Sequence, residues 1–211
     1  VYNLILEVAS SDASVLIHGE SGTGKELTAK AIHHLGPRKE RAFLPVNCGG
    51  IPDTLIESEF FGYKKGAFSG AHIDKAGFLE IARNGTLFLD EIGEINPGMQ
   101  VKLLRAIDGD GFTPLGGSSV LKPRPRIISA TNRDLEGLVQ TGRMRPDFFY
   151  RINVVPIHRP PLRERKEDIP ILILHFLKTF TKKGPLPHIP PDIMHALEAY
   201  PWPGNVRELQ N

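Results

Sequence analysis

Seven residues near the start of the chain have the types and the spacing of a phosphate-binding loop. They follow the pattern G-x-x-x-x-G-K and are Gly19, Glu20, Ser21, Gly22, Thr23, Gly24 and Lys25. Glycines let backbone N–H groups turn inward around phosphate oxygens, and a helix after the loop adds the positive end of its dipole. The lysine brings a point charge to the β and γ phosphates. The pattern predicts a nucleoside triphosphate site, and a glycine-rich turn without a ligand is the simpler alternative.

Two adjacent carboxylates, Asp90 and Glu91, follow the apolar run at 86–89. At the end of a strand, one carboxylate can hold magnesium, directly or through water, while the other polarises an attacking water molecule. The spacing alone does not say which carboxylate takes which role. A solvated acidic turn would also explain the pair by itself, but the glycine loop earlier in the chain favours magnesium-dependent hydrolysis of a nucleotide.

Length and composition are those of an ordinary globular protein. The chain has 211 residues, of which 40% are hydrophobic and 24% charged, enough for one sizeable core with a smaller subdomain. A net charge of +2 is too small to indicate nucleic-acid binding. One cysteine, no membrane-length apolar run and no secretory signal lead us to expect a cytoplasmic protein. Both ends fall within expected helices, so we expect a fragment of a longer protein.

Short apolar strands alternate with helical patterns over most of the chain. The strand candidates are 15–18, 44–46, 86–89, 126–130 and 154–157. Helices are expected over 1–9, after the glycine loop, and after Asn96, a cap candidate that is followed by Pro97. This alternation predicts a parallel sheet covered by helices on both faces.

The pattern changes after the run Arg159-Pro160-Pro161. Helical patterns cover 168–183 and 191–200 with no strand between them, and a break at 201–204 precedes another helix. Asn205 is expected to cap that last helix, with Glu208 completing a capping box. The end of the chain is therefore expected to be a small helical subdomain.

Four further segments accompany the two motifs. They are Gly66-Ala67-Phe68-Ser69-Gly70-Ala71, Ala130-Thr131-Asn132-Arg133-Asp134-Leu135, Pro160-Pro161-Leu162-Arg163-Glu164-Arg165 and Trp202-Pro203-Gly204-Asn205-Val206-Arg207-Glu208-Leu209. Together the six motifs resemble the central AAA+ domain of bacterial enhancer-binding proteins, the activators of sigma-54 RNA polymerase. The resemblance covers nearly the whole chain. Glu26, which stands after Lys25 where the general motif has Ser or Thr for magnesium, also agrees with this family.

The resemblance implies an α/β fold of the AAA+ P-loop NTPase type. A parallel sheet between helices would occupy 1–160, and a truncated helical lid 161–211. It implies ATP and Mg²⁺ as cofactors, with Asp90 organising the magnesium, directly or through water, and Glu91 activating water. It also implies hydrolysis of ATP to ADP and phosphate, coupled to remodelling of closed sigma-54 polymerase complexes so that promoters open. It also implies a bacterial cytoplasmic protein whose regulatory and DNA-contacting domains lie outside this chain.

Segment 66–71 resembles the family's Gly-Ala-Phe-Thr-Gly-Ala loop, which contacts sigma-54 and moves with the nucleotide state. Gly66 and Gly70 permit a tight, mobile turn that leaves Phe68 at an exposed tip. Ser69 stands where the family has Thr, which removes one methyl group worth about 0.8 kcal/mol if it is buried at the contact. A loop whose Phe68 packs into the core is the alternative.

Three polar residues match family positions that respond to the nucleotide. Asn47 matches the asparagine that holds the catalytic glutamate according to ligand state, Asn132 the first sensor near the γ phosphate, and Arg207 the second sensor in the lid. The alternatives are an ordinary strand-end asparagine, a turn residue and a solvated helix arginine. Cys48, beside Asn47, is expected to serve packing rather than chemistry.

Arg145 and Arg151 match arginines that reach the nucleotide of the neighbouring subunit in the family. A guanidinium there can offset charge on the transferring phosphoryl group, worth about 10³-fold or more in rate. Such shared sites imply self-association into a ring, hexameric by resemblance, with a dimer as the inactive form. Ion pairing within the chain, with Asp147 or Glu164, is the alternative.

Three other functions would use part of this machinery. A AAA+ ATPase of another class that acts on DNA, such as a helicase or loader, has the nucleotide motifs without the 66–71 loop. A non-enzymatic nucleotide-gated module would not need Lys25, Asp90, Glu91 and both arginines together, and a small-molecule kinase would not need the arginine pattern or the lid sequence. We therefore predict the sigma-54 activator, with the DNA-acting class as the alternative.

Overall fold

The computed structural model describes residues 2–181 and 184–211, and these form two compact units. The first unit comprises the chain up to His18 and from Glu26 to Ile157, and the second comprises Gly19–Lys25 and His158–Asn211. The helices expected over 1–9 and 168–183 include three positions outside the described residues, at 1, 182 and 183. Within the described ranges, no helix is both long and apolar enough to cross a membrane.

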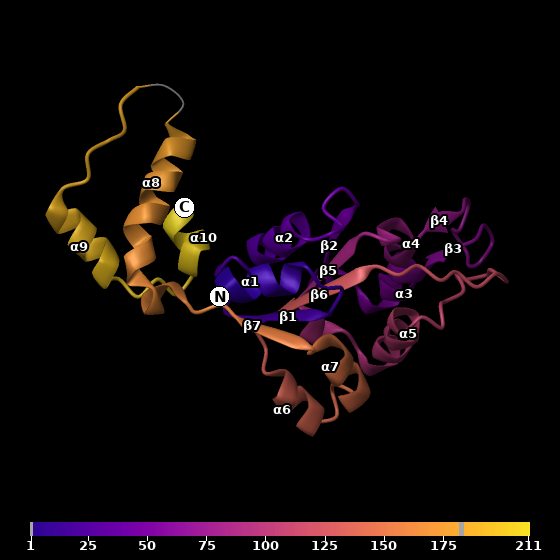
Figure 1. The fold of residues 1–211 in the computed structure, drawn as a ribbon. Coiled ribbons are helices and arrows are strands. Elements are labelled where there is room, and N and C mark those ends of the chain that lie inside the picture. Colours follow the sequence, from indigo (N-terminus) through magenta and orange to yellow (C-terminus); the bar gives the residue numbers. More distant parts are fainter. Residues whose placement is uncertain (1, 182–183) are drawn as a thin grey trace. The chain divides into compact units, whose positions relative to one another are not determined.

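A five-stranded sheet forms the centre of the first unit (Figure 1). The β2–β5, β5–β6 and β6–β1 pairs are parallel, so these four strands end at the same edge. Each strand candidate is confirmed, with at most one residue of difference at either end. The order across the sheet is β2 (Phe43–Asn47), β5 (Thr86–Asp90), β6 (Arg126–Thr131), β1 (Val15–His18) and β7 (Val155–His158).

Alternate residues of each strand point to opposite faces of the sheet, and helices cover both faces. On one face Ile17, Phe88 and Ile128 pack with α1 (Tyr2–Ala9) and α2 (Lys25–Leu35). On the other face, residues such as Leu16 and Leu87 pack with the remaining helices of this unit. These helices are α3 (Asp53–Phe61), α4 (Phe78–Ala82), α5 (Pro97–Asp108), α6 (Leu135–Gln140) and α7 (Pro146–Ile152). The predicted parallel sheet between helical layers is confirmed.

Helix α5 begins where the sequence predicts and positions the start of α7. The Asn96 Oδ1 accepts a hydrogen bond from Met99 N at 2.9 Å, and Pro97 occupies the first turn, where its missing N–H is not needed. Within α5, the fully buried Gln100 donates through Nε2 to the Arg143 carbonyl at 3.0 Å. Its Oε1 accepts from Arg145 N at 2.8 Å, so α5 fixes the backbone that enters α7.

A small antiparallel hairpin carries segment 66–71. Its strands are β3 (Gly62–Tyr63) and β4 (Lys75–Ala76). Leu115, from a separate loop, lies along β3: its N–H donates to Gly62 O at 3.0 Å and its carbonyl accepts from Lys64 N at 2.9 Å. An ion pair of 2.8 Å between Lys64 Nζ and Asp74 Oδ2 closes the base of the hairpin loop. The hairpin is therefore anchored at its base, and within its loop Ala67 lies against Gly116, where an added Cβ would be 2.8 Å from the Ala67 Cβ.

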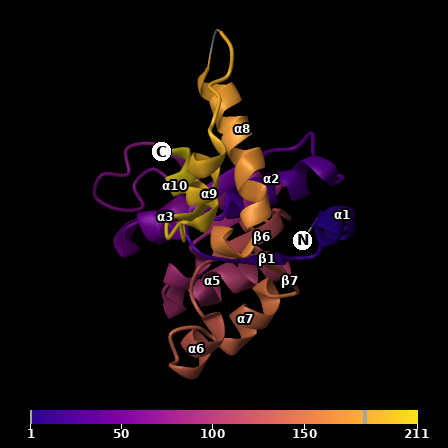
Figure 2. The same ribbon diagram turned by 90° about the vertical axis from the view of Figure 1, so that its left-hand side faces the viewer.

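The second unit contains helices and the glycine loop. Helix α8 (Ile169–Phe180) packs with α9 (Pro191–Ala199) and with α10 (Asn205–Gln210), as Figure 2 shows. Their core contains Leu162, Ile169, Ile173 and Trp202. Between positions 159 and 211, the described residues contain no strand. The expectation that this part of the chain forms helices with no strand between them is confirmed for the described residues.

The start of α10 differs from the expectation. Gly204, and not Asn205, stands at the cap position, and Asn205 is the first helical residue, with a left-handed φ of 55°. Glu208 does reach back as a capping-box residue, because its Oε2 accepts from Gly204 N at 2.8 Å. The Asn205 side chain is thereby released from capping, and it is fully buried.

Gly22 of the glycine loop lies against the backbone of the turn before α10. A Cβ added to Gly22 would lie 2.3 Å from the Gly204 carbonyl oxygen, and the residue has a φ of +78°. The Gly22 carbonyl accepts a hydrogen bond from Val206 N at 3.0 Å. Both the space and the backbone angle therefore require glycine at this position.

We expect Gly22→Ala to destabilise the second unit by more than the conformational cost of a left-handed alanine, about 1–2 kcal/mol, because its methyl group also meets a backbone oxygen. Gly184→Ala is the matched control: it has a φ of +106° in the same unit and nothing within 4 Å of the added carbon. The chain's one tryptophan, Trp202, reports unfolding of this unit by fluorescence during urea titration. Equal losses in the two variants would contradict the close-contact argument.

Candidate functional site

The glycine loop curls around its own lysine. Thr23 is buried, and its Oγ1 donates to Glu20 O at 2.8 Å, which closes a turn in the middle of the loop. Lys25, the first residue of α2, donates through Nζ to Gly19 O at 2.9 Å and to Glu20 O at 3.1 Å. Gly24 has a φ of +95°, so the loop turns sharply just before the helix begins. The loop thus has the form of an anion-binding site at the N-terminus of a helix, with the Lys25 ammonium group beside it.

Glu20 of the loop is held by residues from the helical part of the second unit. Its two carboxylate oxygens accept from Arg163 Nη1 at 2.9 Å and Nη2 at 2.7 Å, a bidentate pair. Oε2 also accepts from Asn205 Nδ2 at 3.1 Å. The Arg163 hydrogen bonds, followed by the one from Asn205, lower the pKa of Glu20 to about 2. Glu20 is therefore ionised and anchors the loop to Arg163 and Asn205.

Asn205 and Arg207 also hold the loop, through hydrogen bonds to Ser21. Asn205 Nδ2 donates to Ser21 O at 3.0 Å, and its Oδ1 accepts from Leu162 N at 2.7 Å. Arg207 is exposed and its Nη1 donates to Ser21 Oγ at 3.0 Å. The structure therefore places Arg207 at the glycine loop. Sequence reasoning missed Arg163 and Asn205 as partners of the loop, since neither contact leaves a local periodic signal.

Asn47, Asp90 and Glu91 gather at the carboxyl edge of the sheet in the first unit. Asn47 and Asp90 are register partners at the ends of β2 and β5. Asp90 Oδ1 accepts from Glu91 N at 3.0 Å, and Glu91 has a left-handed φ of 55°. This bond fixes the Asp90 carboxylate at the end of its strand. The sharp turn sends the Glu91 side chain back toward the strand end next to it.

Gly49 separates Asn47 from Glu91. Asn47 Oδ1 accepts from Gly49 N at 3.0 Å and from Gly50 N at 3.2 Å, capping the short 3₁₀ turn Cys48–Gly50. A Cβ on Gly49 would lie 2.3 Å from Glu91 Oε2, so the absence of a side chain there lets the carboxylate lie against the turn. Across residues 2–181 and 184–211, no hydrogen bond joins Asn47 to Glu91 directly.

Asn132 follows β6 at the same edge of the sheet. The strand ends at Thr131, which is fully buried and accepts a hydrogen bond from Arg133 N through Oγ1 at 3.0 Å. Asn132 itself is exposed. Arg133, which sequence reasoning did not single out, pairs with Glu94 at 2.6 Å. Because β5 and β6 are parallel neighbours, Asn132 and the two carboxylates extend from adjacent strand ends.

Arg145 and Arg151 each pair within the chain. Arg145, just before α7, donates to Asp147 through Nε at 3.1 Å and Nη2 at 2.9 Å. Arg151 Nε lies 2.5 Å from Asp108 Oδ1, and its Nη2 donates to the Ile107 carbonyl at 3.2 Å. The Asp147 pair is one that the sequence suggested as an alternative, whereas the Asp108 pair was not foreseen. Both arginines are partly exposed, at 46% and 38% of their side-chain surface.

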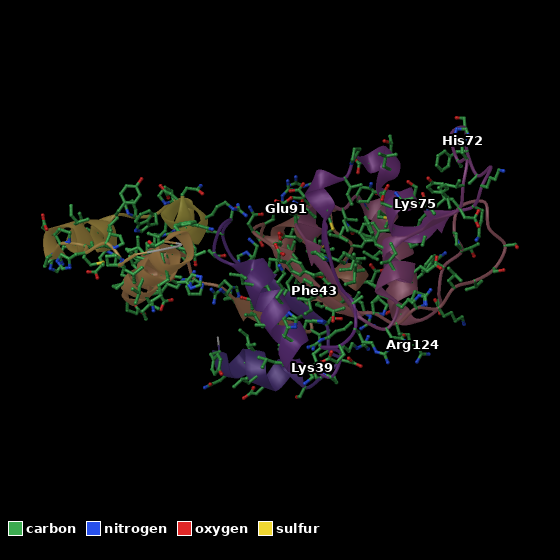
Figure 3. The ribbon with its side chains drawn as sticks, turned by 90° about the horizontal axis from the view of Figure 1, so that it is seen from above. Lys39, Phe43, His72, Lys75, Glu91 and Arg124 are labelled. Atoms are coloured by element: carbon green, nitrogen blue, oxygen red, sulfur yellow. The ribbon has the colours of Figure 1, made fainter. Side chains whose placement is uncertain are left out.

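The hairpin loop 66–71 leaves Phe68 outside the core. Gly66 and Gly70 have φ values of +85° and +107°, and Gly66 N donates to Ala71 O at 2.8 Å. Phe68 is 44% exposed, and its ring meets Tyr63 edge-on, with centroids 4.9 Å apart. Figure 3 shows Glu91 at one end of the first unit and His72, next to this loop, at another. The loop is therefore well separated from the two carboxylates.

Cys48 lies in the core beside the carboxylate pair. Its side chain is only 3% exposed. Burial raises the pKa of the Cys48 thiol, and the negative charges of Asp90 and Glu91 raise it further. Cys48 therefore packs as a neutral thiol.

Comparison with known proteins places both parts of the chain. Residues 1–158 match the family described as Sigma-54 interaction domain, and residues 163–211 match the AAA+ ATPase lid domain. The Nif-specific regulatory protein of Herbaspirillum seropedicae is 50% identical over 213 residues, which cover 100% of this chain and 39% of the relative. The response regulator protein PilR of Pseudomonas aeruginosa is 51% identical over 211 residues, or 99% of this chain and 47% of PilR. The chain thus spans less than half the length of these curated relatives.

The solved structure of NtrX from Brucella abortus in complex with ATP superposes with a TM-score of 0.90 at 38% identity, covering 100% of this chain and 48% of NtrX. The Saccharomyces cerevisiae Hsp104–casein complex, at 20% identity and a TM-score of 0.69 over 93% of this chain and 38% of Hsp104, shares the fold alone. The chain therefore belongs to the sigma-54 interaction domain family and carries an AAA+ ATPase lid.

Proposed function

We propose that this chain is the ATP-hydrolysing part of a transcriptional activator that remodels closed complexes of sigma-54 RNA polymerase, so that promoters open. The observation that carries the proposal is that one sigma-54 interaction domain contains both a glycine loop hydrogen-bonded to the lid residue Arg207 and a loop with a solvent-exposed Phe68. The ATP and ADP complexes of NtrX support the choice of nucleotide, because NtrX aligns over the whole chain.

The residues at the two motifs suit MgATP. Lys25 and the loop 19–24 bind the phosphates, with Glu26 exposed at the next position. Asp90 holds Mg²⁺, directly or through water: carboxylate oxygen is a ligand that this cation prefers, and the Glu91 N–H bond already orients the group. The bound cation supplies charge neutralisation at the phosphates. Glu91 activates the attacking water.

Three further residues respond to the nucleotide in this proposal. Arg207 already contacts the loop through Ser21, and it would exchange this contact for phosphate. Asn132 extends from the strand next to β5 and reads the γ phosphate. Asn47 acts on Glu91 through the turn that it caps, since Gly49 lies between them.

We expect Glu91→Gln to bind ATP with nearly unchanged affinity and to lose turnover by a factor of about 10²–10⁴, the usual contribution of a general base. The amide keeps the size of the side chain and removes its basicity. Lys25→Ala is the companion variant and should lose ATP binding itself. The measurements are ATP affinity by calorimetry and phosphate release at saturating MgATP. Undiminished turnover in Glu91→Gln would assign the base elsewhere.

Arg145 and Arg151 would complete the nucleotide site of a neighbouring subunit in a ring. Both side chains reach the surface, and each is paired with a carboxylate that a phosphate could replace. We expect the ATPase rate per subunit to rise steeply with protein concentration, and Arg151→Ala to lower the high-concentration rate about 10³-fold. Arg124→Ala, at an exposed arginine elsewhere in the unit, is the control. A concentration-independent rate per subunit would contradict shared sites.

Phe68 would deliver the nucleotide-dependent contact to sigma-54. Phe68→Ala should keep ATPase activity within about twofold, because the loop is well away from the carboxylates, and should abolish capture of purified sigma-54 with an ATP transition-state mimic. Phe180→Ala removes another exposed phenylalanine, 58% exposed on α8, and should leave capture unchanged. Normal capture by Phe68→Ala would refute the loop assignment, and DNA-stimulated hydrolysis would favour a DNA-acting ATPase.

A further inference from the structure

Two arginines of the second unit, Arg159 and Arg165, converge on one backbone oxygen of the glycine loop. Arg159 Nη2 donates to the Thr23 carbonyl at 3.2 Å, and Arg165 Nη2 donates to the same oxygen at 3.1 Å. The Arg165 side chain is only 12% exposed. Neither residue belongs to the phosphate-loop motif, and neither has a role in the function proposed above.

One neutral oxygen does not balance two positive charges. Asp168 Oδ2 is 3.4 Å from Arg165 Nη1, a long contact for an ion pair. The Nε atoms of Arg159 and Arg165 are buried and have no hydrogen-bond acceptor among the described residues. Burial, followed by the charge of Arg165, lowers the pKa of Arg159, as expected for a cation that is only partly compensated. The loop is thus flanked by surplus positive charge.

Arg159 also touches both ends of the loop. A Cβ on Gly19 would lie 2.8 Å from the Arg159 carbonyl oxygen, and one on Gly24 would lie 3.7 Å from Arg159 Nη2. The Thr23–Gly24 peptide is trans, so its carbonyl and its N–H point in opposite directions. Two guanidinium groups that hold the Thr23 carbonyl therefore direct the Gly24 N–H away from themselves. In phosphate loops it is these N–H groups that face the phosphates.

We propose that Arg159 and Arg165 are positioning residues for the triphosphate. They fix the Thr23–Gly24 peptide in the orientation that turns its N–H toward the phosphates, and the bound phosphates balance the surplus charge of the arginine pair. This inference rests on the proposed nucleotide binding. A purely structural arginine would, when lost, lower both the nucleotide affinity and the stability of the unliganded fold. Loss of Arg159 should instead weaken nucleotide binding and leave the unliganded fold as stable as before, because the fold does not compensate the charge that is removed.

The decisive variant is Arg159→Leu in the full 211-residue chain. We expect its Kd for MgATP to rise about tenfold, its Tm without nucleotide to stay equal or rise, and its kcat at saturating MgATP to change less than about twofold. Arg159→Lys keeps a charge without the planar fork and should recover part of the affinity. Arg165→Gln removes the other guanidinium from the same carbonyl and should also raise Kd. Lys178→Gln, which removes one exposed charge from the same unit, should change neither Kd nor Tm.

Two results would overturn the inference. One is an unchanged Kd in both Arg159→Leu and Arg165→Gln. The other is a rise in Kd that is accompanied by a matching fall in unliganded Tm, which would show that the arginines act through the stability of the fold alone. Lys25→Ala, measured in parallel, separates this failure from failure of the proposed function. If Lys25→Ala also binds MgATP normally, nucleotide binding at the loop is wrong; if it alone loses binding, only the arginine inference fails.

Discussion

The glycine loop and the turn before α10 approach so closely that two backbones, rather than side chains, form their contact. Gly22 and the Gly204 carbonyl meet at a separation that leaves no room for a Cβ, and the Val206 N–H closes the contact. The buried Asn205 side chain connects the two segments, because it forms hydrogen bonds with Glu20, with the Ser21 carbonyl and with the Leu162 N–H. The shape of the phosphate loop is consequently set by residues more than 130 positions away in the sequence.

A second constraint operates at the carboxyl edge of the sheet. Glu91 adopts a left-handed conformation that costs a non-glycine residue about 1–2 kcal/mol. Its N–H bond to Asp90 and the fully buried Ile92 that follows it hold the turn in place. Strain of this kind persists where the surrounding structure over-determines it, and it is often found at functional sites. Here the consequence is that Asp90 accepts the Glu91 N–H while the Glu91 carboxylate lies against Gly49.

The sequence predicted those features that depend on local periodicity and spacing. Short apolar runs located all five strands of the central sheet, and Asn96 with Pro97 located the start of α5, because each signal lies within a few residues of what it determines. Asn205 was interpreted as a cap for the same local reason. Its real partners lie in the glycine loop, so no nearby residue could reveal them.

Long-range pairs account for the other differences. The contacts of Arg163 with Glu20, and of Arg159 and Arg165 with Thr23, join segments that only the tertiary fold brings together. Arg151 selects Asp108, at the end of α5, and not the acidic residues that are closer to it in sequence. Arginines have many acceptable acceptors in any chain, and the choice among them is made by packing. Gly49 is explained only once Glu91 is seen lying against it.

Cys48 gives the carboxylate edge a chemical property of its own. A thiol that is buried and surrounded by negative charge stays protonated, and the protonated form is a poor nucleophile. Oxidants and alkylating reagents are thus kept from the chain's one cysteine for as long as the turn after β2 remains closed. The rate at which this thiol is modified therefore reports local opening of the structure next to Asp90 and Glu91, and the measurement needs no added label.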